Sequence, residues 1–367
     1  MKIAQILPEL NAGGVERGTL EIAAYLVNQG HEAIVVSNGG RQVEALERSG
    51  ARHVTMPVHR KSLATLLQVL PMRRLLIQEK PDIVHIRSRV PGWVTWLAWR
   101  GMDPATRPRL VSTVHGFYSV NAYSRIMTRG ERVIAVSESI RSYILENYPQ
   151  TQVEKIRVIP RGIEPSDYGV DFQPTVAWLT RWRLAQPRLA GKYVILLPGR
   201  ITRLKGHEDF FQLIAGLKRD GIAIHGLIAG DTHEKKHAYL DELRSAVQIL
   251  GITEEITFLG HRSDIREVMA VSDLVCALSQ QPESFGRTVL EAMALGKPVV
   301  GYDCGGVGEL QASLFPAGRV PPGDTLQLEE TTRAIIQTRP RPLLVGEPFT
   351  LQAMCHATEA VYRELVQ

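Results

Sequence analysis

Short apolar strands that alternate with helical segments restrict the fold of this chain more than any other feature of its sequence. In the first half the predicted strands are Lys2–Leu7, Ala33–Ser37, Asp82–Ile86, Leu110–Thr113 and Arg132–Val136. In the second half they are Lys192–Arg200, Ala223–Ala229, Ile256–Leu259, Asp273–Ser279 and Pro298–Tyr302. This alternation predicts doubly wound parallel sheets, which bind ligands at the carboxyl ends of their strands.

The length of the chain indicates that the alternation fills two α/β domains. The 367 residues exceed one ordinary domain, which typically has about 150–200 residues. We predict an N-terminal domain over residues 1–168, a C-terminal domain over residues 169–349 and a last helix over residues 350–367. A Pro-rich segment, residues 339–348, precedes that helix.

One stretch of the second half, residues 282–300, combines a turn, a short helix and a strand. Its sequence is PESFGRTVLEAMALGKPVV, and the helix predicted to begin at Thr288 ends at the Gly-Lys-Pro sequence. The turn closes on Gly286. Backbone N–H groups of Gly286, Arg287 and Thr288 are therefore predicted at a helix N-terminus that follows a strand, where phosphate binds well.

Two carboxylates flank this turn, Glu283 before it and Glu291 inside the helix. Taken alone, Glu283 is also explained as a loop charge and Glu291 as a helix-surface carboxylate. Their E-x7-E spacing, with the Phe-Gly turn and the Gly-x-Pro stop, closely resembles the signature of retaining glycosyltransferase family 4. The resemblance implies a GT-B fold, in which two Rossmann-like doubly wound domains face a cleft and the last helix, residues 350–367, crosses back to the N-terminal domain. It also implies that Glu283 lies beside the donor sugar and that Glu291 holds the ribose hydroxyls of the nucleotide.

The C-terminal domain also carries two cations between glycines. The sequence from Gly199 to Gly206 resembles the G-R-x-x-x-x-K-G element of the same family. Arg200 and Lys205 lie five residues apart across a strand-to-helix turn, so both side chains can reach one diphosphate, although loop cations of no special role would look the same. Further on, the sequence Gly-His-Arg262 resembles the loop whose main chain holds the nucleotide base.

The N-terminal domain offers a glycine loop and a histidine. Gly13 and Gly14 separate the first strand from a helix; they do not match the dinucleotide fingerprint, and a plain tight turn explains them equally well. They resemble the family's Gly-Gly loop, which faces the donor phosphate and the acceptor. His115 directly follows a predicted strand, as does a family histidine near the sugar 6-hydroxyl and the phosphates, although a lone histidine is usually structural. Arg161 stands where the family usually has Asn, which puts any carried-over role there in doubt.

The positive charge is concentrated in the first half. Residues 1–170 hold 22 Lys and Arg against 15 Asp and Glu, whereas residues 171–367 hold 21 against 23. A basic half suits phosphorylated acceptors, lipid headgroups or nucleic acid, but no nucleic-acid-binding module is recognised. Predicted helices at Ser62–Gln78 and Tyr118–Arg129 carry much of this charge and fit a headgroup-facing surface or a solvated one. Trp93, Trp96 and Trp99 suit a membrane belt or, as we favour, a core-facing helix.

No other feature suggests a cofactor or an export route. The three cysteines lack metal-ligand spacing and suit a reducing compartment. No Asp-x-Asp motif indicates a metal-bound donor, so we expect neither a metal nor any cofactor besides the donor substrate. No targeting or membrane-spanning segment is recognised, and we expect a cytoplasmic protein, peripheral on the anionic inner face of the membrane.

We therefore expect an enzyme, a retaining hexosyltransferase or other glycosyltransferase. It would move a sugar from a nucleotide-diphosphate donor to a glycan or glycolipid. Within the family the chain most resembles bacterial enzymes that build lipopolysaccharide and other lipid-linked glycans, which implies a role in the biosynthesis of lipopolysaccharide or another cell-envelope glycan. The expected catalytic residues are Glu283, His115, Arg200 and Lys205, and the expected donor-binding residues are Gly13, Gly14, Arg200, Lys205, Arg262, Gly286, Arg287, Thr288 and Glu291. The alternatives are a soluble small-molecule acceptor, a non-catalytic nucleotide-sugar-binding protein, and an epimerase or phosphorylase of the same fold.

Overall fold

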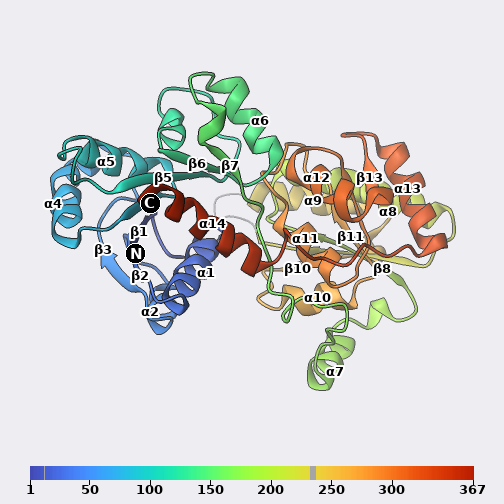
Figure 1. The fold of residues 1–367 in the computed structure, drawn as a ribbon. Helices are drawn as coiled ribbons and strands as arrows, with labels where there is room; N and C mark the ends of the chain where they lie inside the picture. Colours follow the sequence, from blue (N-terminus) through green and yellow to red (C-terminus); the bar gives the residue numbers. More distant parts are fainter. Residues whose placement is uncertain (12, 232–236) are drawn as a thin grey trace. The chain divides into compact units, whose positions relative to one another are not determined.

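The chain divides into two compact units in its computed structural model, which describes all residues except 12 and 232–236 (Figure 1). Unit 1 comprises Met1–Gly162 and Pro348–Gln367, and unit 2 comprises Ile163–Glu347. The sequence placed the first boundary after residue 168, whereas the change of unit follows Gly162. The C-terminal residues thus belong to the same unit as the N-terminus.

Unit 1 is built on a seven-stranded parallel sheet in the order β3-β2-β1-β4-β5-β6-β7. Its strands are β1 (Lys2–Ile6), β2 (Glu32–Ser37), β3 (Arg52–Thr55), β4 (Ile83–Ile86), β5 (Arg109–Val114), β6 (Arg132–Ala135) and β7 (Ile156–Val158). Its helices are α1 (Gly14–Asn28), α2 (Val43–Arg48), α3 (Leu63–Leu66), α4 (Val69–Glu79), α5 (Arg89–Arg100), α6 (Glu138–Asn147) and α14 (Leu351–Val366), with short 3-10 turns η1 (Ser124–Thr128) and η2 (Val153–Lys155). The strand order reverses between β1 and β4, which is the place where doubly wound sheets bind ligands.

The two ends of the chain share one core in unit 1. α1 and α14 lie against each other (Figure 1) and bury Ile22, Leu26 and Met354 together with the strand residues Ile3 and Val35. Such burial of apolar side chains is the main favourable contribution to folding. α4 and α5 pack against each other elsewhere in the unit. The last helix is therefore part of the unit 1 core.

A buried carboxylate of α14 also forms hydrogen bonds with the rest of unit 1. Glu359 accepts hydrogen bonds from the Tyr25 hydroxyl at 3.0 Å and from Arg363 Nε at 2.8 Å, and it lies 2.9 Å from His31 Nε2. Burial alone would raise the pKa of Glu359, but the hydrogen bonds from His31, Arg363 and Tyr25 outweigh it and lower the pKa to about 2. The carboxylate is thus ionised in the folded protein.

Replacing Glu359 by glutamine is expected to destabilise the protein at neutral pH and to leave its stability nearly unchanged in strong acid. The folded pKa of about 2 lies below the ordinary value of 4.5, so the stabilisation is complete above pH 4.5 and disappears as the pH falls toward 2. The unfolding free energies of the wild type and of Glu359→Gln, measured by denaturant titration, should therefore become equal as the pH falls through this range. The largely exposed Glu32, replaced in the same way, is the control. A difference in unfolding free energy that does not change with pH would contradict the assignment.

Unit 2 has a six-stranded parallel sheet in the order β10-β9-β8-β11-β12-β13. Its strands are β8 (Tyr193–Pro198), β9 (Ile224–Ala229), β10 (Ile256–Gly260), β11 (Leu274–Ala277), β12 (Val299–Tyr302) and β13 (Arg319–Val320). Its helices are α7 (Val176–Ala185), α8 (His207–Arg219), α9 (His237–Ile249), α10 (Ile265–Val271), α11 (Arg287–Ala294), α12 (Gly305–Leu314) and α13 (Thr325–Thr338), with 3-10 turns η3 (Pro187–Leu189), η4 (Arg203–Lys205), η5 (Thr253–Glu255) and η6 (Pro316–Gly318). Here the strand order reverses between β8 and β11.

Both sheets confirm the predicted doubly wound α/β fold, but two helix predictions in unit 1 are wrong. Ser62–Gln78 is not one helix: α3 ends at Leu66 and α4 begins at Val69. Pro71 explains the break, because a proline is tolerated in the first turn of α4 but would remove a hydrogen bond inside a longer helix. Tyr118–Arg129 is mostly loop and contains only the turn η1.

The tryptophan repeat on α5 does not face the core, contrary to the interpretation we favoured. The buried residues of α5 include Val94 and Ala98, whereas Trp93, Trp96 and Trp99 are only half-buried. Cations cover their rings: the Arg129 guanidinium lies 4.3 Å from the Trp96 ring centre. Among the residues that the structure describes, no helix is long and apolar enough to span a bilayer.

Candidate active site

The predicted donor residues of unit 2 gather where its strand order reverses. Arg200 and Lys205 follow β8, and Glu283 follows β11, the neighbouring strand in the sheet. Because β8 and β11 are parallel, both segments leave the same edge of the sheet. The loop that carries Arg200 and Lys205 therefore lies beside the loop that carries Glu283, although the two loops are far apart in sequence.

A short ion pair joins Lys205 to Glu283. The Lys205 ammonium lies 2.5 Å from Glu283 Oε1, and the Ser279 hydroxyl donates to the same oxygen at 2.5 Å. Burial would raise the pKa of Glu283, but the charge of Lys205 and the two hydrogen bonds outweigh it and hold the pKa below its usual range. Glu283 is therefore an anion at neutral pH.

Arg200 has a different environment. Its side chain is exposed, and no described residue forms a hydrogen bond or an ion pair with its guanidinium. Nearby Arg203, by contrast, lies 2.5 Å from the Glu242 carboxylate. A planar guanidinium without a carboxylate partner is suited to bind phosphate oxygens in a bidentate manner.

Two glycines allow the loops of this site to come close to other backbone. Gly206 has φ 68° at the start of α8, and a Cβ there would lie 2.1 Å from the Leu278 carbonyl oxygen. Gly286 has φ 89° and caps α11, and a Cβ there would lie 2.8 Å from Val307 Cγ2. Both conformations are disfavoured for other residues. Gly286 thereby starts α11 at Arg287, beside Thr288, as a phosphate-binding helix N-terminus requires.

Glu291 is not a helix-surface carboxylate. Its residue is 4% exposed, and Arg287 Nε lies 3.6 Å from its Oε1. Burial of a carboxylate is costly unless charge and hydrogen bonds compensate it. The position of Glu291 on the buried side of α11 therefore excludes the surface interpretation that the sequence left open.

The Arg262 side chain is occupied inside unit 2. Its Nε and Nη2 donate to the two carboxylate oxygens of Asp264 at 2.8 and 2.5 Å. Trp178 Nε1 donates to the same carboxylate at 2.8 Å. A guanidinium held in this way by a planar carboxylate has fewer donors left for a ligand. The predicted main-chain contact of this loop with a base stays a prediction.

The predicted residues of unit 1 lie at the carboxyl edge of its own sheet. Gly13, which has φ 155°, and Gly14 connect the loop after β1 to α1, and His115 directly follows β5. These residues belong to a different unit from Arg200, Lys205 and Glu283. The structure thus groups the predicted residues into one set in each unit.

His115 has a defined tautomer. Arg161 Nη2 forms a short hydrogen bond with His115 Nδ1, and because arginine only donates, the neutral ring must carry its proton on Nε2. Burial lowers the pKa of His115 well below 6.5, and the charges of Arg161 and Arg87 lower it further. Nε2 is buried and has no partner among the described residues. His115 can therefore donate a hydrogen bond to a ligand but is a poor base.

Replacing Arg161 by asparagine is expected to raise the pKa of His115. The change removes a neighbouring positive charge and the donor that occupies Nδ1, although burial still disfavours the imidazolium. NMR titration of the ring, assigned by comparison with His115→Asn, measures the shift. Arg141→Asn, on the exposed side of α6, is the control. An unchanged titration of His115 would contradict the proposed coupling.

The sequence analysis missed a buried arginine beside this histidine. Arg87 directly follows β4, where the strand order reverses, and is 1% exposed. Its Nη1 donates to Gln5 Oε1 at 3.0 Å, and burial lowers its pKa to about 10. Gly18 leaves room for it, since a Cβ there would lie 3.2 Å from Arg87 Nη2 and 3.5 Å from Arg161 Nη1. The available signal was its position immediately after a predicted strand.

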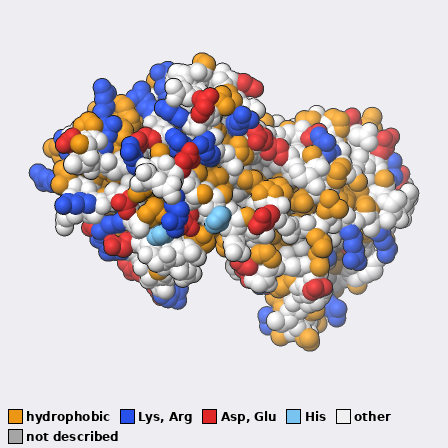
Figure 2. Space-filling model, viewed as in Figure 1, with side chains coloured by type: hydrophobic (Ala, Val, Ile, Leu, Met, Phe, Trp, Pro, Cys, Tyr) orange, Lys and Arg blue, Asp and Glu red, His pale blue; other side chains and the backbone are white. Residues whose placement is uncertain are grey.

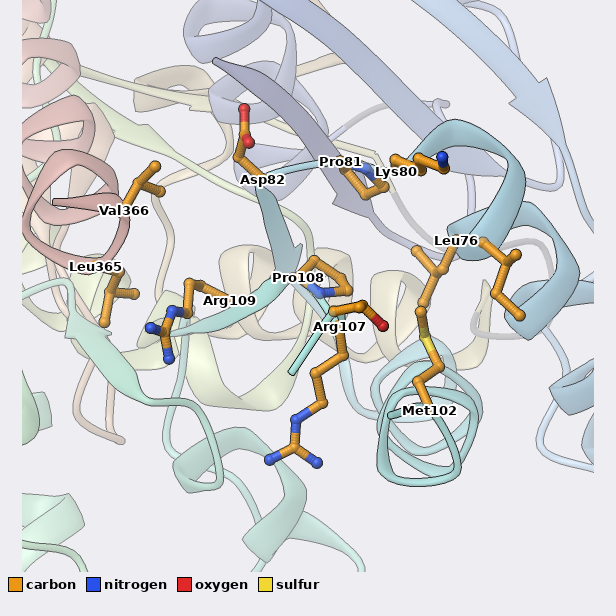
Figure 3. A pocket seen from close by; sticks show the side chains of 12 residues that line it. Leu76, Lys80, Pro81, Asp82, Met102, Arg107, Pro108, Arg109, Leu365 and Val366 are labelled. Atoms are coloured by element: carbon orange, nitrogen blue, oxygen red, sulfur yellow. The ribbon is translucent and has the colours of Figure 1, made fainter. Parts of the chain in front are cut away.

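A cavity of about 560 Å³ lies at the opposite edge of the unit 1 sheet (Figure 3). Its walls include Leu76 of α4, Asp82 and Arg109 at the amino ends of β4 and β5, and Leu365 of α14. Ligands of doubly wound sheets bind at the carboxyl ends of the strands, so this cavity is not part of the candidate site.

The sequence matches family models over both units. Residues 12–167 match the model of Glycosyltransferase Family 4, and residues 180–342 match that of Glycosyl transferases group 1. The chain belongs to glycosyltransferase family 4. The family and GT-B fold predicted from the sequence are thereby confirmed, and the chain is a glycosyltransferase.

Curated relatives of this glycosyltransferase are similar over most of their length. The phosphatidyl-myo-inositol mannosyltransferase of Mycobacterium leprae is 26% identical, with 89% of this chain and 84% of that protein covered. The lipopolysaccharide core biosynthesis mannosyltransferase LpsB of Rhizobium meliloti is 25% identical, with 83% and 94% covered. The 2-deoxystreptamine N-acetyl-D-glucosaminyltransferase of Streptomyces fradiae is also 25% identical, with 86% and 80% covered.

Solved structures have the same fold. A glycosyltransferase from Rickettsia africae superposes with a TM-score of 0.86 at 27% identity, covering 100% of this chain and 98% of that one. The Anabaena protein HepE, solved in complex with UDP, superposes with a TM-score of 0.77 at 23% identity, covering 100% and 96%.

Proposed function

We propose that this glycosyltransferase moves a sugar from a nucleotide-diphosphate donor to a lipid-linked glycan acceptor with retention of configuration. The observation that carries the donor side is the Lys205–Glu283 ion pair where the strand order of unit 2 reverses. In this proposal Lys205 is the cation that meets the leaving diphosphate, and the adjacent Glu283 is the carboxylate that faces the sugar. The UDP complex of HepE supports a nucleotide as the leaving group.

The residues of unit 2 supply the electrostatic part of catalysis in this proposal. Negative charge grows on the diphosphate as the bond to the sugar breaks, and Arg200, Lys205 and the N-terminus of α11 stabilise it without a metal ion. Arg287 and Thr288 begin that helix. The ionised Glu283 lies beside the sugar, where positive charge develops at the anomeric carbon. The acceptor oxygen then bonds to the anomeric carbon on the face that the diphosphate leaves, and the hydroxyl proton passes to the departing diphosphate. Attack on that face retains the configuration.

Unit 1 receives the acceptor in this proposal. Residues 51–130 hold 13 Lys and Arg but three Asp and Glu. All of these cations except the buried Arg87 are exposed or half-buried. A surface with such an excess attracts phosphate-bearing and membrane-bound molecules, and each basic group near an anionic membrane contributes about 1 kcal/mol. The relatives from Mycobacterium leprae and Rhizobium meliloti are named for lipid and lipopolysaccharide substrates, which favours a lipid-linked acceptor at the inner membrane surface. The Streptomyces fradiae relative, named for a water-soluble acceptor, is the reason to test the alternative.

A panel of nucleotide sugars, assayed with and without membrane lipid extract and with 2-deoxystreptamine, tests the proposal. Transfer to extractable lipid with the anomeric configuration of the donor, read by NMR, is the expected result. Transfer only to the soluble acceptor would overturn the lipid-linked part. Isomerised sugar or sugar phosphate formed from the donor alone would instead indicate an epimerase or a phosphorylase.

Replacing Glu291 by alanine is expected to reduce nucleotide affinity more than it reduces the rate of transfer at saturating donor. Loss of a hydrogen-bonding carboxylate to a ribose would raise the dissociation constant by about tenfold, corresponding to roughly 1.4 kcal/mol. Calorimetric titration with UDP and GDP measures the effect, and Glu254→Ala on the exposed turn η5 is the control. If the Glu291 variant binds the nucleotide like the wild type, the ribose assignment is wrong.

A further inference from the structure

Unit 1 contains an apolar cavity of about 480 Å³ with cations among its lining residues. Its walls include Leu63 and Leu66 of α3, Val90 and Trp93 of α5, and Tyr123. Arg60 and Lys61 also line it. Apolar walls combined with cations fit a ligand that has a hydrocarbon part and an anionic group.

The cavity lies at the ligand-binding edge of the unit 1 sheet. Its three lining segments follow the carboxyl ends of β3, β4 and β5. Contacts connect its wall to His115 of the candidate active site: the Arg89 guanidinium lies 5.4 Å from the Tyr123 ring centre and 4.6 Å from that of Tyr118. The Tyr118 hydroxyl in turn accepts a hydrogen bond from the His115 backbone N–H at 3.2 Å. A molecule that starts in the cavity can therefore extend along this edge toward His115.

The cations around the cavity lack carboxylate partners among the residues that the structure describes. Lys61 Nζ lies 4.6 Å from the Tyr123 ring centre, and Arg60 Nε donates to His59 at 3.1 Å. Arg89 donates to the Ser124 hydroxyl at 3.2 Å. Aromatic faces and neutral acceptors hold these cations without neutralising them, so an anion remains the missing partner.

Exposed apolar side chains lie on and next to α3, the helix that forms one wall of the cavity. Leu63 is 85% exposed, Leu67 is 73% exposed and Leu70 is 58% exposed, all on or beside α3 and α4. Figure 2 shows hydrophobic side chains interspersed with Lys and Arg over the region of α4 and α5. Exposed leucines beside cations are typical of segments that lie in a membrane interface. A hydrocarbon chain could pass from a bilayer into the cavity without crossing water.

We propose that the cavity holds the hydrocarbon chain of the acceptor, and that Arg60, Lys61 and Arg89 bind the phosphate that joins this chain to its glycan. The inference rests on the proposed transfer to a lipid-linked acceptor and specifies its chemical class as a lipid phosphate glycan. The glycan then extends past Tyr118 toward His115. Continuity with His115 favours the acceptor as the occupant over a phospholipid that serves only as an anchor.

The probe is a series of alkyl phosphates, used below their critical micelle concentrations. Binding is followed by the fluorescence of Trp93, and the Trp93→Phe variant identifies the signal of that residue. Affinity is expected to rise about tenfold for every two added methylenes through the hexyl, octyl and decyl phosphates, because the chain becomes buried. Inorganic phosphate and decyl glucoside each carry only one of the two features and should bind at least about tenfold more weakly than decyl phosphate. Affinity that does not depend on chain length would overturn the proposal.

Two variants locate the binding. Leu66→Glu places a carboxylate at the cavity wall and Lys61→Glu reverses a rim charge, and each should weaken decyl phosphate binding about tenfold or more. Leu326→Glu, an exposed leucine of α13 in unit 2, makes a similar change elsewhere and should bind decyl phosphate like the wild type. Wild-type affinity in both cavity variants would overturn the proposal.

Two further arms separate this inference from its rivals. In the first, the cavity variants lose binding to phosphatidylglycerol vesicles, but decyl phosphate causes no change of Trp93 fluorescence in the wild type. This result would mean that the surface only binds bilayers, and it would overturn the cavity assignment. Nucleotide-sugar turnover is measured on the same wild-type preparation. If no nucleotide sugar is turned over but decyl phosphate binds as expected, the proposed function falls while the lipid phosphate site stands.

Discussion

Lys205→Ala is expected to lower sugar transfer by about 10²–10³-fold, the effect of removing one preorganised donor from a developing anion. The side chain is 29% exposed and lies 2.5 Å from Glu283. The substitution removes the positive charge that stabilises the leaving diphosphate. It also leaves the Glu283 carboxylate without its cation. Single-turnover rates with saturating donor isolate the chemical step from binding. Arg200→Ala should cause a loss of similar size. Its guanidinium has no partner among the described residues, so in the proposed mechanism it is free to bind the diphosphate.

Lys218→Ala is the matched control for this prediction. Lys218 lies on α8 in the same unit and pairs with Glu255 at 2.9 Å on the surface. An exposed ion pair of this kind contributes little to stability, typically about 0–1 kcal/mol. The control should therefore keep the wild-type rate and melting temperature. Near-normal transfer by both Lys205→Ala and Arg200→Ala would show that neither cation stabilises the leaving diphosphate.

Glu283→Gln is expected to slow transfer by about 10²-fold while nucleotide affinity changes little. The amide has the shape of the carboxylate but lacks the negative charge that faces the sugar. The wild type should also lose activity in acid only as the pH falls through the folded pKa of Glu283, which is held below 4.5. This loss of activity in acid is therefore expected to be absent from the variant. The pH dependence of the single-turnover rates of both proteins measures it.

A double-mutant cycle makes this prediction specific. Because Lys205 and Glu283 form one ion pair, the rate losses of the two single variants should not add in the combined variant. Full additivity would show that the pair does not act as a unit. A Glu283→Gln enzyme with the wild-type rate and pH profile would exclude Glu283 from the reaction.

The sequence by itself determined the features that depend on local pattern. The alternation of apolar strands with helices predicted both parallel sheets, because periodicity and Gly or Pro punctuation act over a few residues. The turn at Gly286 was predictable for the same reason, since its positive φ is a property of that one residue. The family resemblance then named Glu283, Glu291, Arg200 and Lys205.

Tertiary structure alone decided what depends on contacts between distant segments. Lys205 and Glu283 are 78 residues apart in the sequence, and they meet because β8 and β11 are neighbours in the sheet. The half-buried setting of the α5 tryptophans depends on which face of α5 packs against the unit. Arg87 and Arg161 come together beneath Gly18 only when β4, the end of β7 and α1 are assembled. No local pattern encodes these contacts, because burial and charge partners are properties of the packed chain.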